Sequence, residues 1–329
     1  MKTHIAHAQT RNDLEDTAEA AVYLLSGGFP VALPTETVYG LAAWALDTTS
    51  LTRIFQSKER PLFDPLIVHL PTLEWLDNLC AIPAADRRLV DKLVKQFWPG
   101  PLTIVLPRKP VVPDLAAAGL PTIAVRMSAH PIFAHIIEAF GQPLAAPSAN
   151  RFGRISPTTA RHVYDELNGR IPLIVDGGAT RHGVESTIVT VRENRLWILR
   201  NGPITAEELG RYADVASASH GPRPTVPGQL KSHYAPATPF QLLPHGATPT
   251  AAGLGKVGLL SLCEQTEGGF YHVEVLSEMG DLREAAANLF AKMRILDSMN
   301  LDLILAESLP EMGLGAAIMD RLQKAAGNG

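Results

Sequence analysis

Two cationic residues, Lys58 and Arg60, are separated by one residue in a segment whose backbone freedom is restricted by Pro61 and Pro65. The apolar stretch after this segment ends at His69. In an extended backbone alternate residues point to the same side, so the pattern predicts that both cationic heads face one ligand. Phosphate groups suit such a pair. A solvated loop is the alternative interpretation, because Lys-x-Arg pairs are also common on surfaces.

Three other polar segments come directly after apolar stretches that predict strands. Open α/β sheets bind ligands just beyond their strands, so these segments are candidates for one shared site. A helix cap or a turn is the alternative role for each Ser, Thr or Asn, and a structural role is the alternative for His69. The candidate residues are Thr35, Ser148, Asn150, Ser156, Ser186 and Arg200.

Arg126 closes the predicted strand 122–126, between apolar residues. Thr122 and Arg126 lie two positions on either side of Ala124, so they share one face of that strand. A half-buried guanidinium needs an anionic partner, and no carboxylate is close to Arg126 in the sequence. We therefore expect a ligand carboxylate or phosphate as its partner.

The remaining pattern predicts the elements that position these residues. Asp13 is the expected N-cap of a first helix, which Gly27 and Gly28 end. Helices and strands mix without strict alternation, which predicts a mixed α/β sheet. Further helices are expected at 51–56, 87–97, 132–140 and 160–167, strands at 31–33, 66–70, 102–106, 122–126, 144–146 and 173–175, and a hairpin at 186–191 and 196–199.

A chain of 329 residues is long enough for two domains. From about 214 to 239 the composition changes to Ser, Pro, Gly and His, which indicates a linker. Beyond it, short strands and two helices at 282–299 and 314–326 predict a smaller α/β domain with a Rossmann-like arrangement. The predicted division is a catalytic domain at 1–213, a linker at 214–239 and a C-terminal α/β domain at 240–329.

The composition excludes several classes of protein. With 46% hydrophobic and 19% charged residues and a net charge of -4, the chain is neither disordered nor suited to tight, nonspecific nucleic-acid binding. Cys80 and Cys263 have neither metal nor redox spacing. The N-terminus has no leader-like apolar segment, and no stretch is long enough to span a bilayer, so we expect a cytoplasmic protein without a membrane partner. The G-x-G-x-x-G at 253–258 precedes a strand, so it is no dinucleotide fingerprint.

Six motifs follow one another along the chain. They are Pro34–Leu41 (PTETVYGL), Lys58–Pro61 (KERP), Pro65–His69 (PLIVH), Trp98–Thr103 (WPGPLT), Pro147–Asn150 (PSAN) and Glu185–Ile188 (ESTI). In this order they closely resemble the motifs of the YrdC-type L-threonylcarbamoyladenylate synthases. A seventh segment, Val226–Pro236 (VPGQLKSHYAP), is similar to the linker of the long form of that family, which carries an extra C-terminal domain. The chain departs from the family pattern at Asp64, where Asn is frequent, and at Gln229, where Met is frequent.

The resemblance implies a twisted open mixed sheet with a deep basic cleft. It also implies synthesis of threonylcarbamoyl-AMP and pyrophosphate from L-threonine, bicarbonate or CO2, and ATP, assisted by Mg2+. The product would pass to the machinery that makes N6-threonylcarbamoyladenosine in tRNA, and direct tRNA binding stays open. By resemblance, L-threonine is bound by Thr35, His69, Arg126, Ser186 and the backbone at Ala146, and the nucleotide by Lys58, Arg60, Thr122, Ser148, Asn150, Ser156 and Arg200, with Tyr234 closing over it.

The residue types agree with this reaction. The threonine amine would attack CO2, and the resulting N-carboxylate would attack the α-phosphorus of ATP. Because both reactants are anions, the site must neutralise charge, which Lys58 and Arg60 as catalytic cations, Arg200 and Mg2+ can do. No protein nucleophile and no metal site built from side chains are needed.

Two alternatives remain at the level of the sequence. The first is a carbamoyl-adenylate-forming enzyme that uses carbamoyl phosphate, although such chains usually carry zinc-finger and acylphosphatase modules that this sequence lacks. The second is a double-stranded RNA-binding module that uses the basic cleft, although the acidic net charge disfavours it.

The linker is expected to act as a lid. Lys231, His233 and Tyr234 offer a cation and two rings suited to cover a nucleotide, and Pro227 and Pro236 limit the freedom of the segment between them. Closure would exclude water and protect a labile acyl-adenylate. A plain tether between two domains is the alternative.

Overall fold

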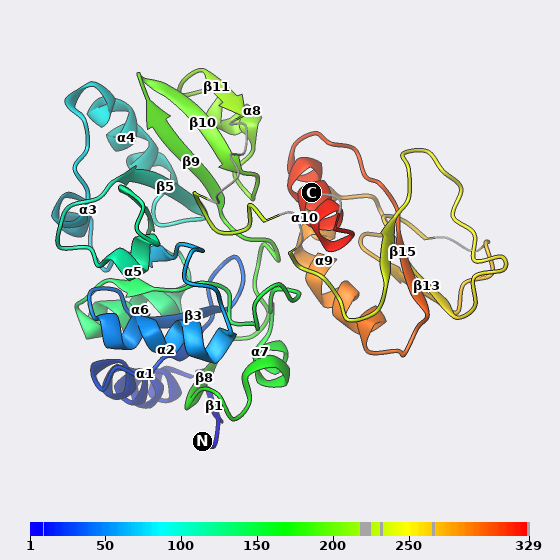
Figure 1. Ribbon diagram of the computed structural model, residues 1–329, viewed down its shortest axis with the longest axis horizontal. Helices are drawn as coiled ribbons and strands as arrows, with labels where there is room; N and C mark the ends of the chain where they lie inside the picture. The colour runs from blue at the N-terminus through cyan, green and yellow to red at the C-terminus, as the bar shows by residue number, and fades with distance from the viewer. Residues whose placement is uncertain (9, 218–224, 231–232, 265–266, 328–329) are drawn as a thin grey trace.

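The computed structural model describes residues 1–8, 10–217, 225–230, 233–264 and 267–327. Lys231, which we expected in the lid, lies outside these residues. The chain forms a large α/β unit and a smaller C-terminal unit, and helices of the smaller unit face the larger one (Figure 1).

The larger unit is built on an eleven-stranded mixed sheet with the order β1-β8-β2-β3-β7-β4-β6-β5-β9-β10-β11. Parallel pairs such as β4–β6 and β5–β9 alternate with antiparallel pairs such as β5–β6 and β9–β10. This confirms the predicted mixed sheet. Its strands are β1 (His4–His7), β2 (Val31–Leu33), β3 (Gly40–Trp44), β4 (Ile67–His69), β5 (Leu102–Pro107), β6 (Thr122–Arg126), β7 (Leu144–Ala145), β8 (Leu173–Asp176), β9 (Thr187–Arg192), β10 (Arg195–Arg200) and β11 (Val215–Ser217).

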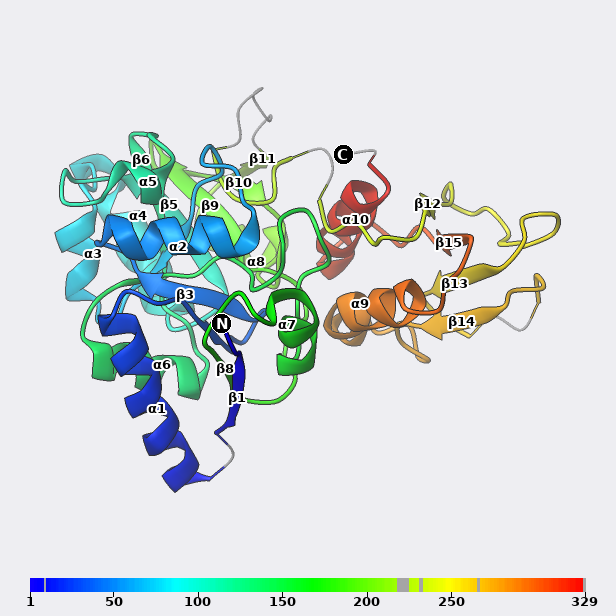
Figure 2. The same cartoon turned by 60° about the horizontal axis from the view of Figure 1, so that its bottom comes forward.

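Helices cover the two faces of this sheet unequally. α1 and α6 pack together on one face of the half that contains β2 and β8, and α2 and α4 cover the opposite face (Figure 2). The strands alternate accordingly, since Val31 and Leu33 pack towards α1 and α6, whereas Ala32 packs towards α2. The helices are α1 (Arg11–Ser26), α2 (Thr48–Lys58), α3 (Glu74–Leu79), α4 (Ala84–Phe97), α5 (Asp114–Ala117), α6 (Pro131–Phe140), α7 (Ala160–Leu167) and α8 (Ala206–Leu209).

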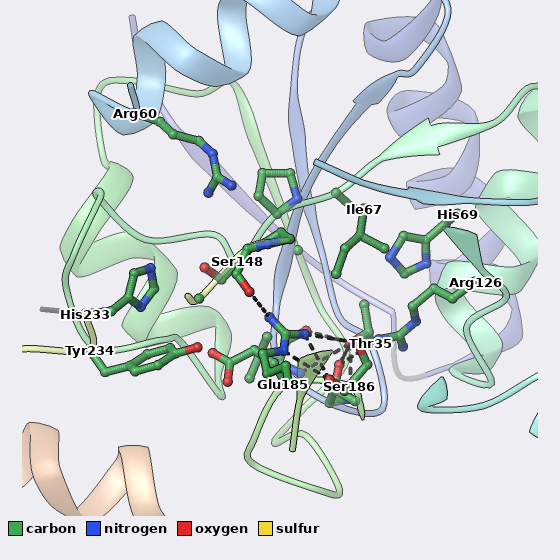
Figure 3. Close-up of a pocket in the computed structure, with 18 residues that line it drawn as sticks. Thr35, Arg60, Ile67, His69, Arg126, Ser148, Glu185, Ser186, His233 and Tyr234 are labelled. Atoms are coloured by element: carbon green, nitrogen blue, oxygen red, sulfur yellow. Dashed lines mark hydrogen bonds between the residues drawn. The ribbon is translucent and has the colours of Figure 1, made fainter. Parts of the chain in front are cut away.

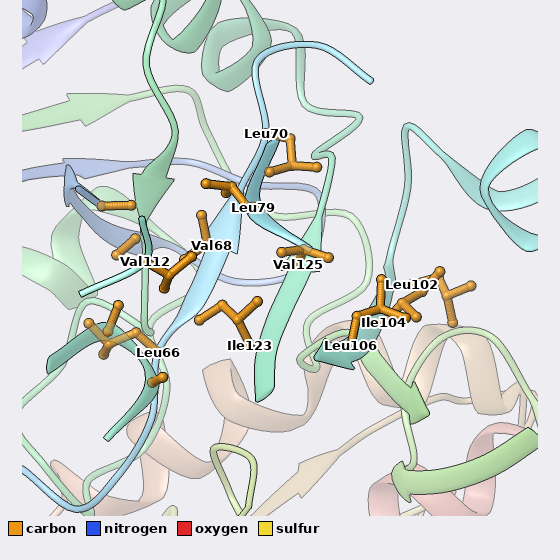
Figure 4. Packing of buried hydrophobic residues seen from close by; sticks show 14 of the residues in the cluster. Leu66, Val68, Leu70, Leu79, Leu102, Ile104, Leu106, Val112, Ile123 and Val125 are labelled. Carbon is orange, nitrogen blue, oxygen red and sulfur yellow. The ribbon is translucent and has the colours of Figure 1, made fainter. Parts of the chain in front are cut away.

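In the part of the chain that the structure describes, the apolar cluster on one face of the other half of the sheet contains no helix residue, and this free face becomes the floor of the site. Val68, Val125 and Ile104 point into the main core (Figure 4). Their neighbours Ile67 and Ala124 point to the free face, where they form a small apolar cluster. The period of two along each strand thus divides β4 and β6 into a core face and a ligand face.

The C-terminal unit has a four-stranded parallel sheet with the order β12-β15-β13-β14. Both of its helices pack on each other and on one face of this sheet, through Leu260 and Ile304. Loop residues such as Phe270 cover the other face, so the described residues form two layers rather than a sheet with helices on both sides. The elements are β12 (Phe240–Leu242), β13 (Val257–Ser261), β14 (His272–Val275), α9 (Leu282–Asp297), β15 (Leu303–Ala306) and α10 (Leu314–Ala325).

Two sequence-based expectations about elements are wrong. Thr10, not Asp13, caps α1. The Thr10 side chain accepts a hydrogen bond from the Asp13 amide, and the Asp13 carboxylate accepts one from the Thr10 amide. This capping box moves the start of the helix upstream. The expected linker also begins too early, because Val215–Ser217 pairs in parallel with β10 as an edge strand of the large sheet.

Candidate active site

A cavity of about 50 Å³ lies on the free face of the large sheet. The carboxyl ends of the parallel strands β4 and β6 meet there with the start of β9 and the end of β10. Figure 3 shows His69 and Arg126 on one side of this cavity and His233 and Tyr234 on the other. The lining residues include Thr35, Thr37, Arg60, Ile67, His69, Arg126, Ala146, Ser148, Glu185, Ser186, Arg200, Gly228, His233 and Tyr234.

Linker residues account for the small size of the cavity. Pro227, Gly228, His233 and Tyr234 belong to its lining, and Val226 is fully buried on the apolar floor with Ile188. Sites for nucleotide-sized ligands occupy roughly 300–1,000 Å³. The linker therefore fills part of the space that such a ligand needs.

Lys58 and Arg60 do not form the extended pair that their spacing predicts. Asp47 caps α2, which buries Leu51 and Phe55 and continues as far as Lys58. Glu59 then takes a left-handed conformation with φ 54°. The two cationic side chains consequently leave the backbone in different directions, and of the two only Arg60 lines the cavity.

Lys58 is fully buried and holds the loop that contains Ser148 and Asn150. Its ammonium donates to the carbonyl oxygens of both residues at 2.5 Å. Burial, followed by the neighbouring charge of Arg60, lowers the Lys58 pKa well below its ordinary value. A phosphate bound near the ammonium would favour its charged form.

Arg60 is also committed to protein groups. Its guanidinium donates to the Pro65 carbonyl at 2.7 Å and forms a buried ion pair with Asp64 at 2.9 Å. Asp64 is the position at which the chain departs from the family motif. Its carboxylate balances the charge of Arg60, while its own pKa is raised by burial.

Arg126 has a protein carboxylate as its partner, contrary to the expectation from the sequence. Its Nη2 atom donates to Glu36 at 2.6 Å, and Ser128 donates to the other Glu36 oxygen at 2.5 Å. Glu36 lies 90 residues before Arg126, so local sequence gives no sign of the pair. Within the described part of the chain, the buried Arg126 Nε atom has no hydrogen-bond partner, which leaves a donor for a ligand carboxylate.

His69 lies opposite Arg126 in the register of β4 and β6. Its ring packs against Phe133 with centroids 4.5 Å apart, and no residue that the structure describes makes a hydrogen bond to its buried Nδ1 atom. Burial, and then the charge of Arg126, lowers the pKa of His69 well below its ordinary value. The residue is therefore a neutral imidazole beside a guanidinium, which suits a polar ligand group next to a carboxylate.

Ser186 and Arg200 are joined by hydrogen bonds at the start of β9. Arg200 donates to the Ser186 carbonyl from Nε and Nη2, and Ser186 shares a hydrogen bond of 2.8 Å with Thr103. Arg200 also donates to the carbonyl of Pro227 in the linker, at 3.2 Å. Arg200 thus connects the site with the segment that covers it.

The other predicted residues take supporting positions. Asn150 donates to the Arg151 and Arg154 carbonyls, and its Oδ1 atom is buried without a partner. Ser156 donates to Glu185 at 2.5 Å. The loop residue Thr35 and Ala146 line the cavity, although the Ala146 amide is already bonded to Ile67. Lys58, Thr122, Asn150 and Ser156 are outside the cavity lining.

Sequence reasoning missed two acidic residues at the site, Glu36 and Glu185. Both belong to motifs quoted above, but neither is among the candidate residues predicted from the sequence. Each of them forms a buried ion pair, Glu36 with Arg126 and Glu185 with Arg321. Lys58 and Arg200, by contrast, donate to backbone carbonyls, and neither forms an ion pair with a described residue. These two cations are the surplus positive charge of the site.

Comparison with known proteins agrees with this fold and site. The family model described as telomere recombination (Sua5_yciO_yrdC) matches residues 23–202, and the model described as threonylcarbamoyl-AMP synthase, C-terminal domain, matches residues 204–327. The chain therefore belongs to the Sua5/YciO/YrdC family. Within it, both matches together define the two-domain threonylcarbamoyl-AMP synthases.

The relatives span the whole chain. A threonylcarbamoyl-AMP synthase of Bacillus subtilis is 40% identical, covering 94% of this chain and 92% of that protein, and one of Pyrococcus abyssi is 41% identical, covering 90% of each. The crystal structure of P. abyssi Sua5 complexed with L-threonine is similar with a TM-score of 0.89 and 38% identity, covering 99% of this chain and 98% of that one. Escherichia coli YciO, at 20% identity, 61% and 96% coverage and a TM-score of 0.52, shares the fold.

None of the helices in the described residues combines the length and apolar composition that crossing a bilayer requires.

Proposed function

We propose that this chain synthesises threonylcarbamoyl-AMP and pyrophosphate from L-threonine, bicarbonate or CO2, and ATP. The observation that carries the proposal is the pairing of two kinds of anion site in one cavity. Arg126 and His69 offer a carboxylate site at the ends of β4 and β6, and Arg60 and Arg200 line the same cavity as phosphate-type cations. The full-length similarity to threonylcarbamoyl-AMP synthases supports the same assignment.

In this proposal Arg126 holds the threonine carboxylate through its free Nε donor, and Ser186, Thr35 and His69 surround the rest of the amino acid. The neutral amine forms a C–N bond to CO2 and loses a proton, which gives an N-carboxylate. One oxygen of this carboxylate then forms a bond to the α-phosphorus of ATP, and the bond to pyrophosphate breaks. The residues supply position and charge, because substrate groups make and break every bond.

The cations have distinct tasks in the second step. Arg200 and Lys58 carry the surplus charge that offsets repulsion between the N-carboxylate and the triphosphate. Lys58 acts through the 148–150 loop, which it holds by two hydrogen bonds, and through its charge. Arg60 lines the cavity on the same side as Ser148, where the nucleotide would enter.

Mg2+ is assigned to the substrate, as MgATP. The described residues contain no group of three or more His, Cys, Asp or Glu side chains that could hold a metal ion. Glu185 lines the cavity, but both of its oxygens are already engaged, by Ser156 and Arg321. The protein residues therefore do not fit a resident metal site, and the phosphates would bring the ion with them.

The linker acts as the lid in this proposal. Tyr234 and His233 sit in the cavity wall, and both would have to move for a nucleotide to enter. Reclosure over bound ATP would exclude water from the acyl-adenylate. The product would then pass to the enzymes that transfer the threonylcarbamoyl group to tRNA.

Pyrophosphate release tests the proposal. We expect release with L-threonine, bicarbonate and MgATP, and a rate at least about 10²-fold lower with L-valine, which lacks the hydroxyl that the site would bind. Equal rates with valine, or release that needs carbamoyl phosphate instead of threonine, would show that the substrate assignment is wrong.

A further inference from the structure

The C-terminal unit packs directly behind the residues of the site. Its helices form one apolar cluster with Val38, Ile155, Val184 and Tyr234 of the rest of the chain. Each of the first three is adjacent in sequence to a site residue, namely Thr37, Ser156 or Glu185. The C-terminal unit therefore supports the loops that carry the site.

The loop that leads to Glu185 packs closely against α9 of the C-terminal unit. Gly183 has φ +68°, and a Cβ atom there would lie 2.4 Å from the carbonyl oxygens of Ala286 and Ala287 in α9. No larger side chain fits between the loop and the helix without displacement. The position of the 183–186 loop is thus defined by the docked C-terminal unit.

A charged side chain of the C-terminal unit crosses this interface and contacts a residue that lines the cavity. Arg321 of α10 is fully buried, and its Nε atom donates to Glu185 at 3.0 Å. Its Nη1 atom donates to Asp320 at 2.6 Å, and Asp320 is also paired with Lys324. The guanidinium lies 5.4 Å from the ring centroid of Tyr234, which also stacks on Phe290 of α9.

Arg321 would affect nucleotide binding through its ion pair with Glu185. The Glu185 carboxylate lines the cavity, whereas Arg321 does not. Burial alone would raise the Glu185 pKa, but Arg321 and then Arg200 outweigh it, so the pKa is lowered and the carboxylate stays ionised. Without Arg321, an uncompensated negative charge would face the phosphates of ATP.

We propose that Arg321 is a positioning residue for the reaction: from the C-terminal unit, it neutralises Glu185 and so preserves the positive charge of the nucleotide pocket. The cluster of Glu185, Asp320, Arg321 and Lys324 is neutral as a whole. Removal of the guanidinium leaves it with one negative charge, next to Ser156 and Tyr234. This inference rests on ATP being a substrate, as proposed above.

The test compares ATP binding with threonine binding in the full chain, by calorimetry with MgATP and with L-threonine. For Arg321→Met we expect ATP binding to weaken about tenfold or more, and threonine binding to change by less than about threefold. The second substitution in Arg321→Met/Glu185→Gln removes the stranded charge, so ATP affinity should return to within about threefold of the parent. Arg321→Lys, which keeps a positive charge, should bind ATP better than Arg321→Met.

Arg294→Met is the matched control. Arg294 also crosses from α9 and forms an ion pair with Glu166, but Glu166 is outside the cavity lining and keeps a second partner in Arg151. If Arg321 only stabilises the contact between the two units, Arg321→Met and Arg294→Met should weaken the binding of ATP and of threonine to the same extent, and adding Glu185→Gln should not restore ATP affinity. Equal weakening of both ligands, or a failure of Glu185→Gln to restore ATP affinity, would overturn the proposal. A parent chain that binds ATP but releases no threonine-dependent pyrophosphate would instead refute the proposed reaction and leave the role of Arg321 testable.

Discussion

Acidification should open the linker, because closure buries His233. In the closed structure the ring lies between Phe152 and Tyr234, with centroid distances of 6.1 and 4.1 Å, and its Nδ1 atom has no hydrogen-bond partner among the described residues. Burial lowers the His233 pKa to about 3; Glu185 opposes this shift, and Arg60, Lys58 and Lys324 add to it. An exposed imidazole has a pKa of about 6.5.

The sign follows from proton binding. The open linker binds a proton below about pH 6.5, whereas the closed linker stays neutral down to pH 3. The contribution of neutral His233 to the stability of the closed linker is therefore fully present above pH 6.5 and decreases as the pH falls towards 3. At pH 5 the loss is about 2 kcal/mol, or about thirtyfold in the closure equilibrium, and at pH 7.5 it is below about 0.1 kcal/mol.

Two measurements check this reasoning. An NMR titration of 13C-labelled histidine follows the His233 resonance, which is assigned by its absence in His233→Gln. The chemical shift of this resonance should stay constant above pH 5. The Ala235 amide, bonded to the Gly153 carbonyl at 2.8 Å, reports closure by hydrogen exchange. Its protection, corrected for intrinsic rates, should fall about thirtyfold between pH 7.5 and 5 in the parent and little in His233→Gln. A His233 that titrates near its ordinary pKa would refute the buried position.

Three further predictions concern the site itself. Arg126→Ala should weaken threonine binding in calorimetry and lower the free energy of unfolding by about 3–5 kcal/mol, because Glu36 is left buried without its cationic partner; adding Glu36→Gln should recover stability but not threonine affinity. Lys58→Met should lower the rate of pyrophosphate release by about 10² or more, with threonine affinity within about threefold, and the opposite pattern would exchange the roles of Lys58 and Arg126. Gly228→Ala should reduce protection of the Ala235 amide by about tenfold, since Gly228 has φ +83° and a Cβ would lie 2.7 Å from the Tyr234 hydroxyl; unchanged protection would contradict the tight closure.

Local sequence was sufficient wherever the signal lies within one element. The apolar runs 66–70 and 122–126 correctly predicted β4 and β6, and the turn between the two later apolar runs correctly predicted the β9–β10 hairpin. The polar segments after the strands were also informative, because strand ends bring such segments to one edge of a sheet. Thr35, Ser148, Ser186 and Arg200 do line one cavity.

Sequence spacing did not predict the correct conformation where a short segment belongs to a neighbouring helix or sheet. Lys58-x-Arg60 is compatible with an extended loop, but helix α2 continues through Lys58 because its buried face with Leu51 and Phe55 favours another turn. The same limit explains β11, since an edge strand of three residues has too little pattern to be distinguished from a linker.

Only the tertiary structure decided which charges are paired. Glu36 and Arg126 are 90 residues apart, and Glu185 and Arg321 are 136 residues apart. Side-chain periodicity carries information over a few residues, whereas the choice of a buried partner depends on how distant elements pack. The sequence alone therefore indicated Lys58, Arg60, Arg126 and Arg200 as candidate cations, and the fold determined that, among the described residues, Lys58 and Arg200 form no ion pair with a carboxylate, whereas Arg321 of the C-terminal unit balances Glu185.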